Sequence, residues 1–287
     1  MRSIAVCMFA RRQGGSTRFA RAGPVCTYAS VVADRLEELC DALERQARAC
    51  EALGSRQYAQ LVEDLIVDVR AGGITWALLS ARPEDPLRDA LVLRYLGAVH
   101  RIVLRGDATG LAAFYPSAGG RALPIPTDLF LETVVAHRDE VEDGLAATVQ
   151  TNEVGRCAAL VPAFAAACRR FRLPLNMVEV GASGGLLSNW DHYWYDCFGQ
   201  TAGEESSAVR FTNRWTDPFT LDGLSRVARR TACDIAPLDV AGQEGRLRLL
   251  SFVWPDQHDR LALLRSALDV AAAHPPDRKS TRLNSSH

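Results

Sequence analysis

The sequence of 287 residues has no surplus of charge of either sign and no long apolar run. Lysine and arginine number 33 against 34 acidic residues, for a formal net charge of −1, and the basic residues form no cluster. This balance argues against a nucleic-acid-binding surface. No uninterrupted apolar stretch approaches the roughly 18 residues that a membrane-spanning helix needs. We therefore expect neither nucleic acid nor a membrane as a partner.

The cysteines lack the close spacing that metal sites and redox motifs use. There are eight cysteines, and no two of them stand at C-x-x-C spacing, so no metal site is predicted. Cys157 and Cys168 share one face of an expected helix. Buried, reduced thiols in a cytoplasmic protein account for this pattern.

Both ends of the chain differ in composition from the rest. Residues 1–33 contain five arginines and no acidic residue. We expect a misassigned start or a disordered extension there, with a secretory or transit signal as the alternative. Residues 277–287 read DRKSTRLNSSH and resemble a codon-for-codon translation of a widely used sequencing adapter. We expect the native sequence to be interrupted near Pro276, and Lys279 and His287 receive no role.

Residues 34–150 have the periodicity of helices and no strand pattern. Apolar residues recur three and four positions apart, and Gly- or Pro-rich stretches separate the runs. The expected helices span about 34–53, 57–70, 86–104 and 127–149. We therefore predict an all-helical N-terminal region.

Residues 151–276 alternate between helical and extended patterns. Helices are expected at about 152–170, 186–195 and 260–273, and extended segments at 175–180, 208–212, 233–240 and 247–253. Such alternation implies right-handed crossovers and a parallel sheet. The predicted fold class is α/β, with a Rossmann-like, methyltransferase-like parallel sheet that is incomplete at its C-terminal end. An incomplete sheet keeps an unpaired edge, which promotes aggregation.

One stretch, residues 175–190, carries most of the functional information. A short apolar strand pattern leads to Glu179, a turn of small residues follows, and a helical pattern begins at Leu186. A turn without bulky side chains lets a ligand contact the backbone, and the first amides of a following helix are unpaired donors. Glu179 beside this turn favours a ligand with hydroxyl or ammonium groups.

Three interpretations of this stretch stay open. As E-x-G-x-S-x-G it resembles the first motif of S-adenosylmethionine-dependent methyltransferases, whose acid and small residues hold the methionine and ribose parts of the cofactor. The cofactor-binding candidates implied by this resemblance are Glu179, Gly181, Ala182, Ser183 and Gly185. As G-x-S-x-G it matches the nucleophile elbow of α/β-hydrolases, with Ser183 as the nucleophile. The third interpretation is a tight turn that binds nothing.

The sequence upstream of the turn makes the hydrolase the least favoured interpretation. An α/β-hydrolase has several strands before its elbow and an H-G-G-G-like loop, whereas helical patterns precede this turn and no such loop occurs. Asp239 or Asp256, followed by His258 or His274, keeps the Ser-Asp-His order, but acids and histidines in that order are common by chance.

Polar residues that precede the motif strand are candidate substrate contacts. Asn152, Glu153 and Arg156 stand at the start of the helix that leads into that strand. We expect this helix end to approach the same pocket. The alternative is that Glu153 and Arg156 form an exposed helix pair worth at most about 0.5 kcal/mol.

Further candidates follow the motif. Asp191 comes after the motif helix, and it either lines the site or caps a neighbouring helix. Asp256 and Gln257 follow the apolar segment 247–253, at the sheet edge where ligands bind; the alternative is a Pro-Asp turn. Methyltransferases use an acid at the end of the second strand to bind the ribose hydroxyls, and no acid directly follows the segment 208–212. Asp234 or Asp239, reached by a different path of the chain, would then take that role.

Four motifs together resemble the bacterial domain-of-unknown-function family 2332. In chain order they are Asn-Glu-Val-Gly-Arg at 152–156, Val-Glu-Val-Gly-Ala-Ser-Gly-Gly-Leu at 178–186, Cys-Asp-Ile-Ala-Pro-Leu-Asp-Val at 233–240 and Val-Trp-Pro-Asp-Gln at 253–257. The resemblance covers about residues 43–276. It implies a Rossmann-like domain and little chemistry.

We therefore expect a cytoplasmic protein that transfers a methyl group from S-adenosylmethionine to a small molecule. Because the sulfonium is already activated, the transfer needs positioning more than acid–base groups. The absence of a sharp catalytic cluster agrees with that expectation. The alternatives are a binding protein without catalysis and a Ser183 hydrolase.

Overall fold

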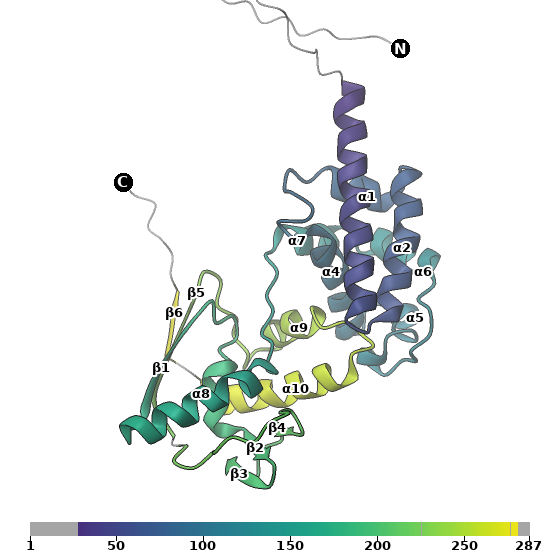
Figure 1. Cartoon of the computed structure of the whole chain (residues 1–287). Coiled ribbons are helices and arrows are strands. Elements are labelled where there is room, and N and C mark those ends of the chain that lie inside the picture. Colours follow the sequence, from purple (N-terminus) through teal and green to yellow (C-terminus); the bar gives the residue numbers. More distant parts are fainter. Residues whose placement is uncertain (1–27, 225, 276, 281–287) are drawn as a thin grey trace, which may run out of the picture.

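The computed structural model describes residues 28–224, 226–275 and 277–280. It contains a helical N-terminal region and a mixed α/β region, which are joined side by side (Figure 1). Most of the expected extension 1–33 and residues 281–287 of the expected adapter segment lie outside the described residues. Residues 28–33 belong to the first helix, so that helix begins earlier than its periodicity predicts.

The helical region is built mainly from the predicted helices, with two corrections. Its elements are α1 (Tyr28–Ala52), α2 (Arg56–Arg70), α3 (Ile74–Ser80), α4 (Leu91–Arg105), α5 (Thr109–Ala112), the 3₁₀ helix η1 (Pro116–Ala118), α6 (Thr127–Ala136) and α7 (Arg138–Ala146). The single helix expected at 127–149 is wrong: His137 leaves the helical backbone conformation (φ −117°, ψ 34°) and separates α6 from α7. The short helix α3 was not predicted.

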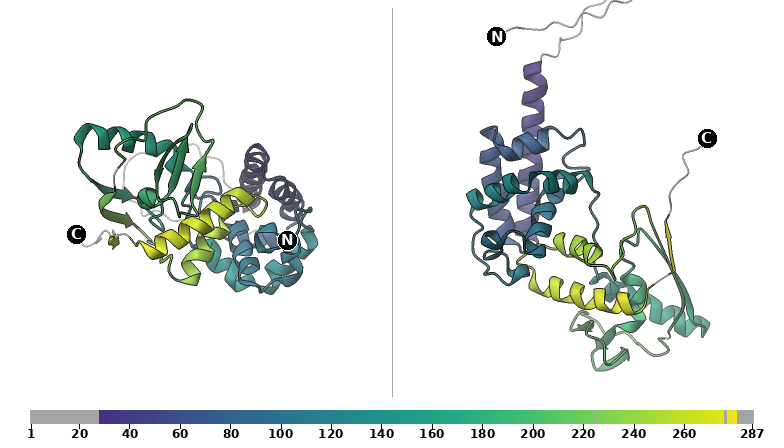
Figure 2. Two further views of the ribbon diagram at one scale, coloured as in Figure 1. Left: turned by 90° about the horizontal axis from the view of Figure 1, so that it is seen from below. Right: turned by 180° about the vertical axis from the view of Figure 1, so that it is seen from behind.

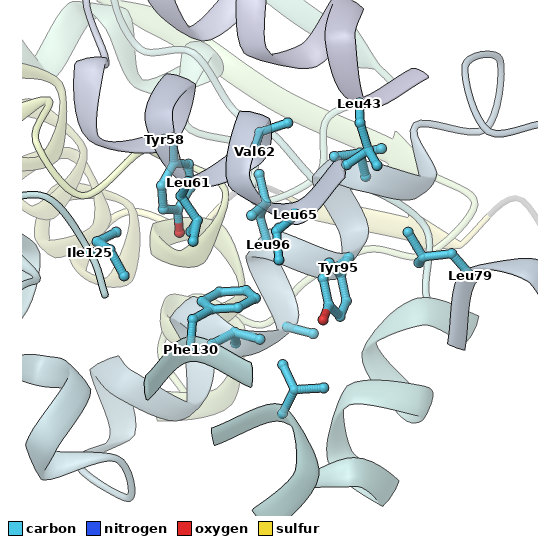
Figure 3. Packing of buried hydrophobic residues seen from close by; sticks show 14 of the residues in the cluster. Leu43, Tyr58, Leu61, Val62, Leu65, Leu79, Tyr95, Leu96, Ile125 and Phe130 are labelled. Atoms are coloured by element: carbon cyan, nitrogen blue, oxygen red, sulfur yellow. The ribbon is translucent and has the colours of Figure 1, made fainter. Parts of the chain in front are cut away.

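Helix α4 is the centre of the helical core. Most of its residues are buried, and α1, α7 and α9 pack against it. Figure 3 shows Leu43, Leu65, Leu96 and Phe130, which come from α1, α2, α4 and α6, gathered in this core. Tyr95 packs edge-on against Phe130, and its hydroxyl lies 3.2 Å from Thr75 Oγ1. The core therefore buries large side chains, and the buried hydroxyl of Tyr95 still has a hydrogen-bond partner.

The second region contains two small sheets. Its elements are α8 (Arg156–Phe171), β1 (Leu175–Val180), the 3₁₀ helix η2 (Leu187–His192), β2 (Trp194–Cys197), β3 (Gln200–Gly203), β4 (Arg210–Thr212), β5 (Val227–Asp234), α9 (Gln243–Ser251), α10 (His258–Ala273) and β6 (Asp277–Ser280). One sheet is parallel with the order β1-β5-β6, and the other has the order β3-β2-β4. The mixed α/β class with a small parallel sheet is confirmed.

Two expected elements after the motif strand are wrong. The helix expected to about residue 195 is the short 3₁₀ helix η2, because Ser188 Oγ donates to Gly185 O and competes with the helical backbone bonds. The strand expected at 247–253 is helical, since α9 ends at Ser251. A short apolar run fits a helix or a strand equally well, and packing of α9 against α4 selects the helix.

The two other extended segments also differ from their expected positions. Residues 210–212 form β4, which belongs to the second sheet rather than to the sheet that contains β1. The strand expected within 233–240 ends at Asp234 and begins at Val227. Consequently β5, and not β4, is the parallel neighbour of β1.

One face of the parallel sheet is poorly covered by the described residues. Along β1, side chains alternate between half-buried and exposed, and Val178 and Val180 are 67 % and 79 % exposed. Strands β1 and β6 are the two edges of this sheet. None of the described helices is long and apolar enough to cross a membrane.

Helices α9 and α10 lie between the sheet and the helical region (Figure 2). Phe252, which follows α9, packs on Gly97 of α4 so closely that a Cβ there would lie 2.7 Å from the ring. Asp256 accepts hydrogen bonds from Ser55 Oγ (2.5 Å) and from the backbone N–H of Gln57 (3.3 Å). Asp256 therefore caps α2 from the other region and joins the two.

We expect Asp256→Ala to destabilise the chain by about 1–3 kcal/mol, because two donors at the junction lose their charged acceptor. Urea unfolding measures this loss. The matched control is Asp259→Ala, since Asp259 is exposed at the start of α10 and its removal costs at most about 1 kcal/mol. Equal losses in the two variants would contradict a capping role for Asp256.

Candidate functional site

The chain leaves β1 through a turn whose backbone is left-handed at three positions. Gly181, Ser183 and Gly185 have φ values of 68°, 50° and 72°. Glycine adopts this conformation freely, whereas it costs a serine about 1–2 kcal/mol. Ser183 is held there by its neighbours: its carbonyl accepts from Leu238 N–H at 3.1 Å.

The turn is packed on one side and open on the other. A Cβ added to Gly184 would lie 2.8 Å from Val240 Cγ1 and 2.9 Å from Leu249 Cδ1, so only glycine fits there without movement. A Cβ added to Gly181 would meet nothing within 4 Å. The backbone at Gly181 is therefore the part of the turn that a ligand can approach.

Asp234 ends the neighbouring strand and contacts the turn. Because β5 runs parallel to β1, both strands end at the same edge, and the amides of Gly181 and Ala182 donate to Cys233 O. The Asp234 carboxylate accepts from Ser183 N–H at 2.8 Å and from Ala236 N–H at 2.9 Å. Asp234 is thus the acid at the carboxyl end of the strand that pairs with β1.

Glu179 is the second carboxyl group at this edge. Its Oε2 accepts from the backbone N–H of Ser188 at 3.1 Å. Burial raises the pKa of Glu179 to about 7; the Ser188 hydrogen bond opposes this shift, and the charge of Asp234 adds to it. The helix N-terminus expected beyond the turn is replaced by the short η2, so carboxylates dominate the electrostatics of this edge. Such a site favours cations and hydroxyl donors over phosphate.

Buried polar atoms without a partner surround the turn. Within the described residues, Ser183 Oγ and Asn152 Oδ1 have no hydrogen-bond partner, and Ser183 is only 5 % exposed. The amide group of Asn152 donates to Ala182 O at 2.7 Å, which places this side chain against the turn. Leaving buried polar atoms unpaired costs about 1–3 kcal/mol each, a cost that a bound ligand with polar groups would remove.

Glu153 lies beside Asn152 but pairs elsewhere than expected. Its carboxylate forms an ion pair with Arg260 of α10, at 2.9 Å from Nε, and accepts from Gly155 N–H. The exposed pair with Arg156 is therefore wrong; Arg156 is exposed at the start of α8. Asn152, Glu153 and Arg260 line a cavity of about 20 Å³, which has room for about one water molecule.

Three predicted substrate contacts are used to hold the fold together. Asp191 is 4 % exposed, accepts from Val227 N–H at 2.9 Å and forms an ion pair with Arg230, so it anchors the start of β5. Asp256 caps α2, and the Gln257 side chain donates to Leu53 O at 3.0 Å. The strand that was expected to carry the last two to the sheet edge is helix α9.

Ser183 lacks the neighbours of a hydrolase nucleophile. Its hydroxyl has no hydrogen-bond partner among the described residues. Of the two histidines considered for a triad, His258 begins α10 and lines a different cavity, while His274 stacks on His192 with ring centroids 3.7 Å apart. The described residues also contain no group of three His, Cys, Asp or Glu that would hold a metal ion.

Comparison with known proteins identifies a family. The family described as "Uncharacterized protein conserved in bacteria (DUF2332)" matches residues 40–282, most of the chain. No curated protein and no solved structure matches the chain. The resemblance drawn from the four sequence motifs is confirmed, and all the candidate site residues fall within the matched range.

The pKa of Glu179 predicts a pH-dependent penalty on stability. The folded chain keeps this proton up to about pH 7, whereas the unfolded chain releases it near pH 4.3. Stability contributed by this group therefore falls between about pH 4.3 and 7, and the full penalty remains above pH 7. We expect Glu179→Gln to raise the free energy of unfolding by about 2 kcal/mol at pH 8 and hardly at all at pH 4.5.

Urea unfolding at the two pH values measures this difference. The control is Glu63→Gln, which changes an exposed carboxylate on α2. If Glu179→Gln shifted stability equally at pH 4.5 and pH 8, the buried carboxyl group would not be protonated in the folded state, and the prediction would be wrong.

Proposed function

We propose that this chain, which belongs to the bacterial family DUF2332, binds S-adenosylmethionine at the turn 181–186 and transfers its methyl group to a small molecule. The observation that carries the proposal is the meeting of Glu179, Asp234 and the open backbone at Gly181 at one edge of the parallel sheet. A Rossmann-like, methyltransferase-like sheet and a cytoplasmic location belong to the same proposal.

The position of the turn supports a ligand site. In parallel sheets, ligands bind beyond the carboxyl ends of the strands, near a crossover. Strands β1 and β5 end side by side there, and the crossover between them contains η2 and the second sheet. Gly181 is the first residue beyond β1, so a ligand at this edge would rest on its backbone.

The charges at the turn favour this ligand over a nucleotide phosphate. Two carboxyl groups, Glu179 and Asp234, face the edge, and Asp234 already occupies the N–H of Ser183. A phosphate would meet these acids and find that amide taken. S-Adenosylmethionine instead brings a sulfonium, an ammonium and two ribose hydroxyls, which carboxylates accept or attract.

Each residue at the turn has a role in this proposal. Asp234 accepts hydrogen bonds from the ribose hydroxyls, and Glu179 in its ionised form, which prevails above about pH 7, attracts the ammonium group. Ser183 Oγ and Asn152 Oδ1 have free hydrogen-bonding capacity for the remaining polar groups. When bound, S-adenosylmethionine supplies a methyl group already activated by its sulfonium, so the chain has to bind and orient rather than provide a strong base.

The acceptor is expected on the side of Asn152. There, the Glu153–Arg260 ion pair lines the same small cavity as Asn152, and Arg156 is exposed at the start of α8. Asp191, Asp256 and Gln257 are removed from this role because their side chains are engaged in the fold. A binding protein that uses the same turn without methyl transfer is the second candidate, because both carboxyl groups at the turn, Glu179 and Asp234, are assigned to ligand binding in this proposal.

Titration calorimetry with S-adenosylmethionine tests the proposal. We expect Gly181→Leu to weaken binding at least about 100-fold (roughly 2.7 kcal/mol), because its side chain fills the open side of the turn. Ser183→Ala should cost about 1 kcal/mol, one ordinary hydrogen bond. ATP should not bind measurably, since its phosphates meet the two acids.

Gly199→Leu is the matched control for backbone strain. Gly199 also has a positive φ (83°) and open space around its Cβ position, but it lies in the β2–β3 turn. We expect this variant to bind S-adenosylmethionine as the native chain does. Undiminished binding by Gly181→Leu, or equal binding of ATP, would refute the site. Binding without transfer of a radiolabelled methyl group to any tested acceptor would favour the binding protein.

A further inference from the structure

A large cavity lies at the junction of the two regions. It is open to solvent, has a volume of about 770 Å³ and is lined by parts of α4, α5, η1, α9 and α10. None of the residues 179–186 contributes to it. Its walls are mainly apolar, with Leu104, Leu250 and Leu261 among them, and its polar lining includes Ser117 and Arg265. Cavities between regions, with apolar walls and a few polar groups, are typical ligand sites.

Ser117 is hydrogen bonded to a histidine behind the cavity wall. His100 of α4 is fully buried. Its Nε2 lies 2.7 Å from Ser117 Oγ, and its Nδ1 lies 3.0 Å from the carbonyl oxygen of Ser251 at the end of α9. A carbonyl oxygen only accepts, so Nδ1 carries the proton. Nε2 is therefore an acceptor, and the Ser117 hydroxyl donates to it.

The surroundings of His100 keep its ring neutral and fix its orientation. Burial lowers the pKa of His100 to about 4, and the nearby charge of Arg265 adds to the shift, so the ring is a neutral acceptor at neutral pH. Tyr58 and Tyr115 pack against the imidazole at centroid distances of 6.5 and 5.3 Å. The tautomer and the orientation that a general base needs are therefore preset by packing and by the Ser251 carbonyl.

A cation stands beside the serine. Arg265 of α10 donates from Nη2 to the backbone oxygen of Ser117 at 2.8 Å and lines the same cavity. Its charge lies beside Ser117, and in the proposal below it stabilises the negative charge that develops on a carbonyl attacked by this serine. If the Ser117–His100–Ser251 hydrogen bonds served only to join the two regions, they would need neither Arg265 nor an adjoining cavity.

We propose that Ser117 is the nucleophile and His100 the general base of a second site, which hydrolyses carboxylic esters with an apolar acyl group. Serine, a neutral histidine and a third group that orients the histidine form the usual arrangement of an activated nucleophile. Here the Ser251 carbonyl is the orienting group, and the apolar walls match the acyl chain. This site is independent of the methyl-transfer site.

The reaction proceeds in two balanced steps. Ser117 Oγ attacks the acyl carbon and passes its proton to His100 Nε2, while the developing oxyanion faces Arg265. The bond from the acyl carbon to the alcohol oxygen then breaks, and the alcohol leaves with the proton from Nε2. Water attacks the acyl-serine and gives a proton to Nε2; the acid departs, and Ser117 Oγ recovers its proton.

A fluorophosphonate probe and p-nitrophenyl butyrate test the proposal on the full chain. We expect the probe to label Ser117, located by peptide mass spectrometry, and Ser117→Ala to abolish labelling and to lower p-nitrophenol release about 100-fold. Arg265→Gln should lower release about 10-fold or more. The control Ser206→Ala changes an exposed hydroxyl that donates to Glu204 and should leave both readouts unchanged.

Labelling of Ser183, labelling of another residue, or no labelling at all would overturn the proposal. If Ser117→Ala unfolds at a lower temperature than the native chain, Ser117→Cys decides instead. A thiol beside His100 should react with iodoacetamide at least about 10-fold faster than the buried native cysteines, and an unreactive Cys at 117 would overturn the proposal. S-Adenosylmethionine binding should not change in either variant, so the two sites fail or succeed separately.

Discussion

Parallel pairing of β1 with β5 creates the candidate cofactor site. The two strands are far apart in the chain, but their pairing brings Glu179 and Asp234 to one sheet edge and ties the amides of Gly181 and Ala182 to the end of β5. Asp234 then holds Ser183 in a left-handed conformation that a serine adopts only under constraint. Without this pairing, neither the shape of the turn nor its acidic character would exist.

A second constraint acts at the junction of the two regions. Asp256 caps α2, Phe252 packs into the space above Gly97, and the Ser251 carbonyl orients His100. All three residues stand at the end of α9 or just beyond it. This short segment therefore both attaches the α/β region to the helical region and shapes the large cavity that Ser117 lines. The Ser251 carbonyl, which belongs to this segment, also sets the tautomer of the buried His100.

The two candidate sites differ in the charged groups that they contain. At the turn, two carboxyl groups, Glu179 and Asp234, lie close together, and burial together with the charge of Asp234 raises the pKa of Glu179 to about 7. At the junction, the buried ring of His100 stays neutral and Arg265 supplies the positive charge. One chain thus presents an acidic open edge and a basic apolar cavity, which suit different ligands.

The sequence alone determined the helical region, the motif turn and the family, because these depend on local periodicity, on glycines and on short motifs. The amphipathic spacing of α2 and the small residues after Glu179 needed no tertiary information. Tertiary structure decided the rest. An apolar run at 247–253 became a helix through packing on α4, Asp191 and Asp256 became anchors, and Asp234 reached the turn through strand pairing. Long-range contacts of this kind leave no periodic signal in the sequence, since their partners are distant along the chain.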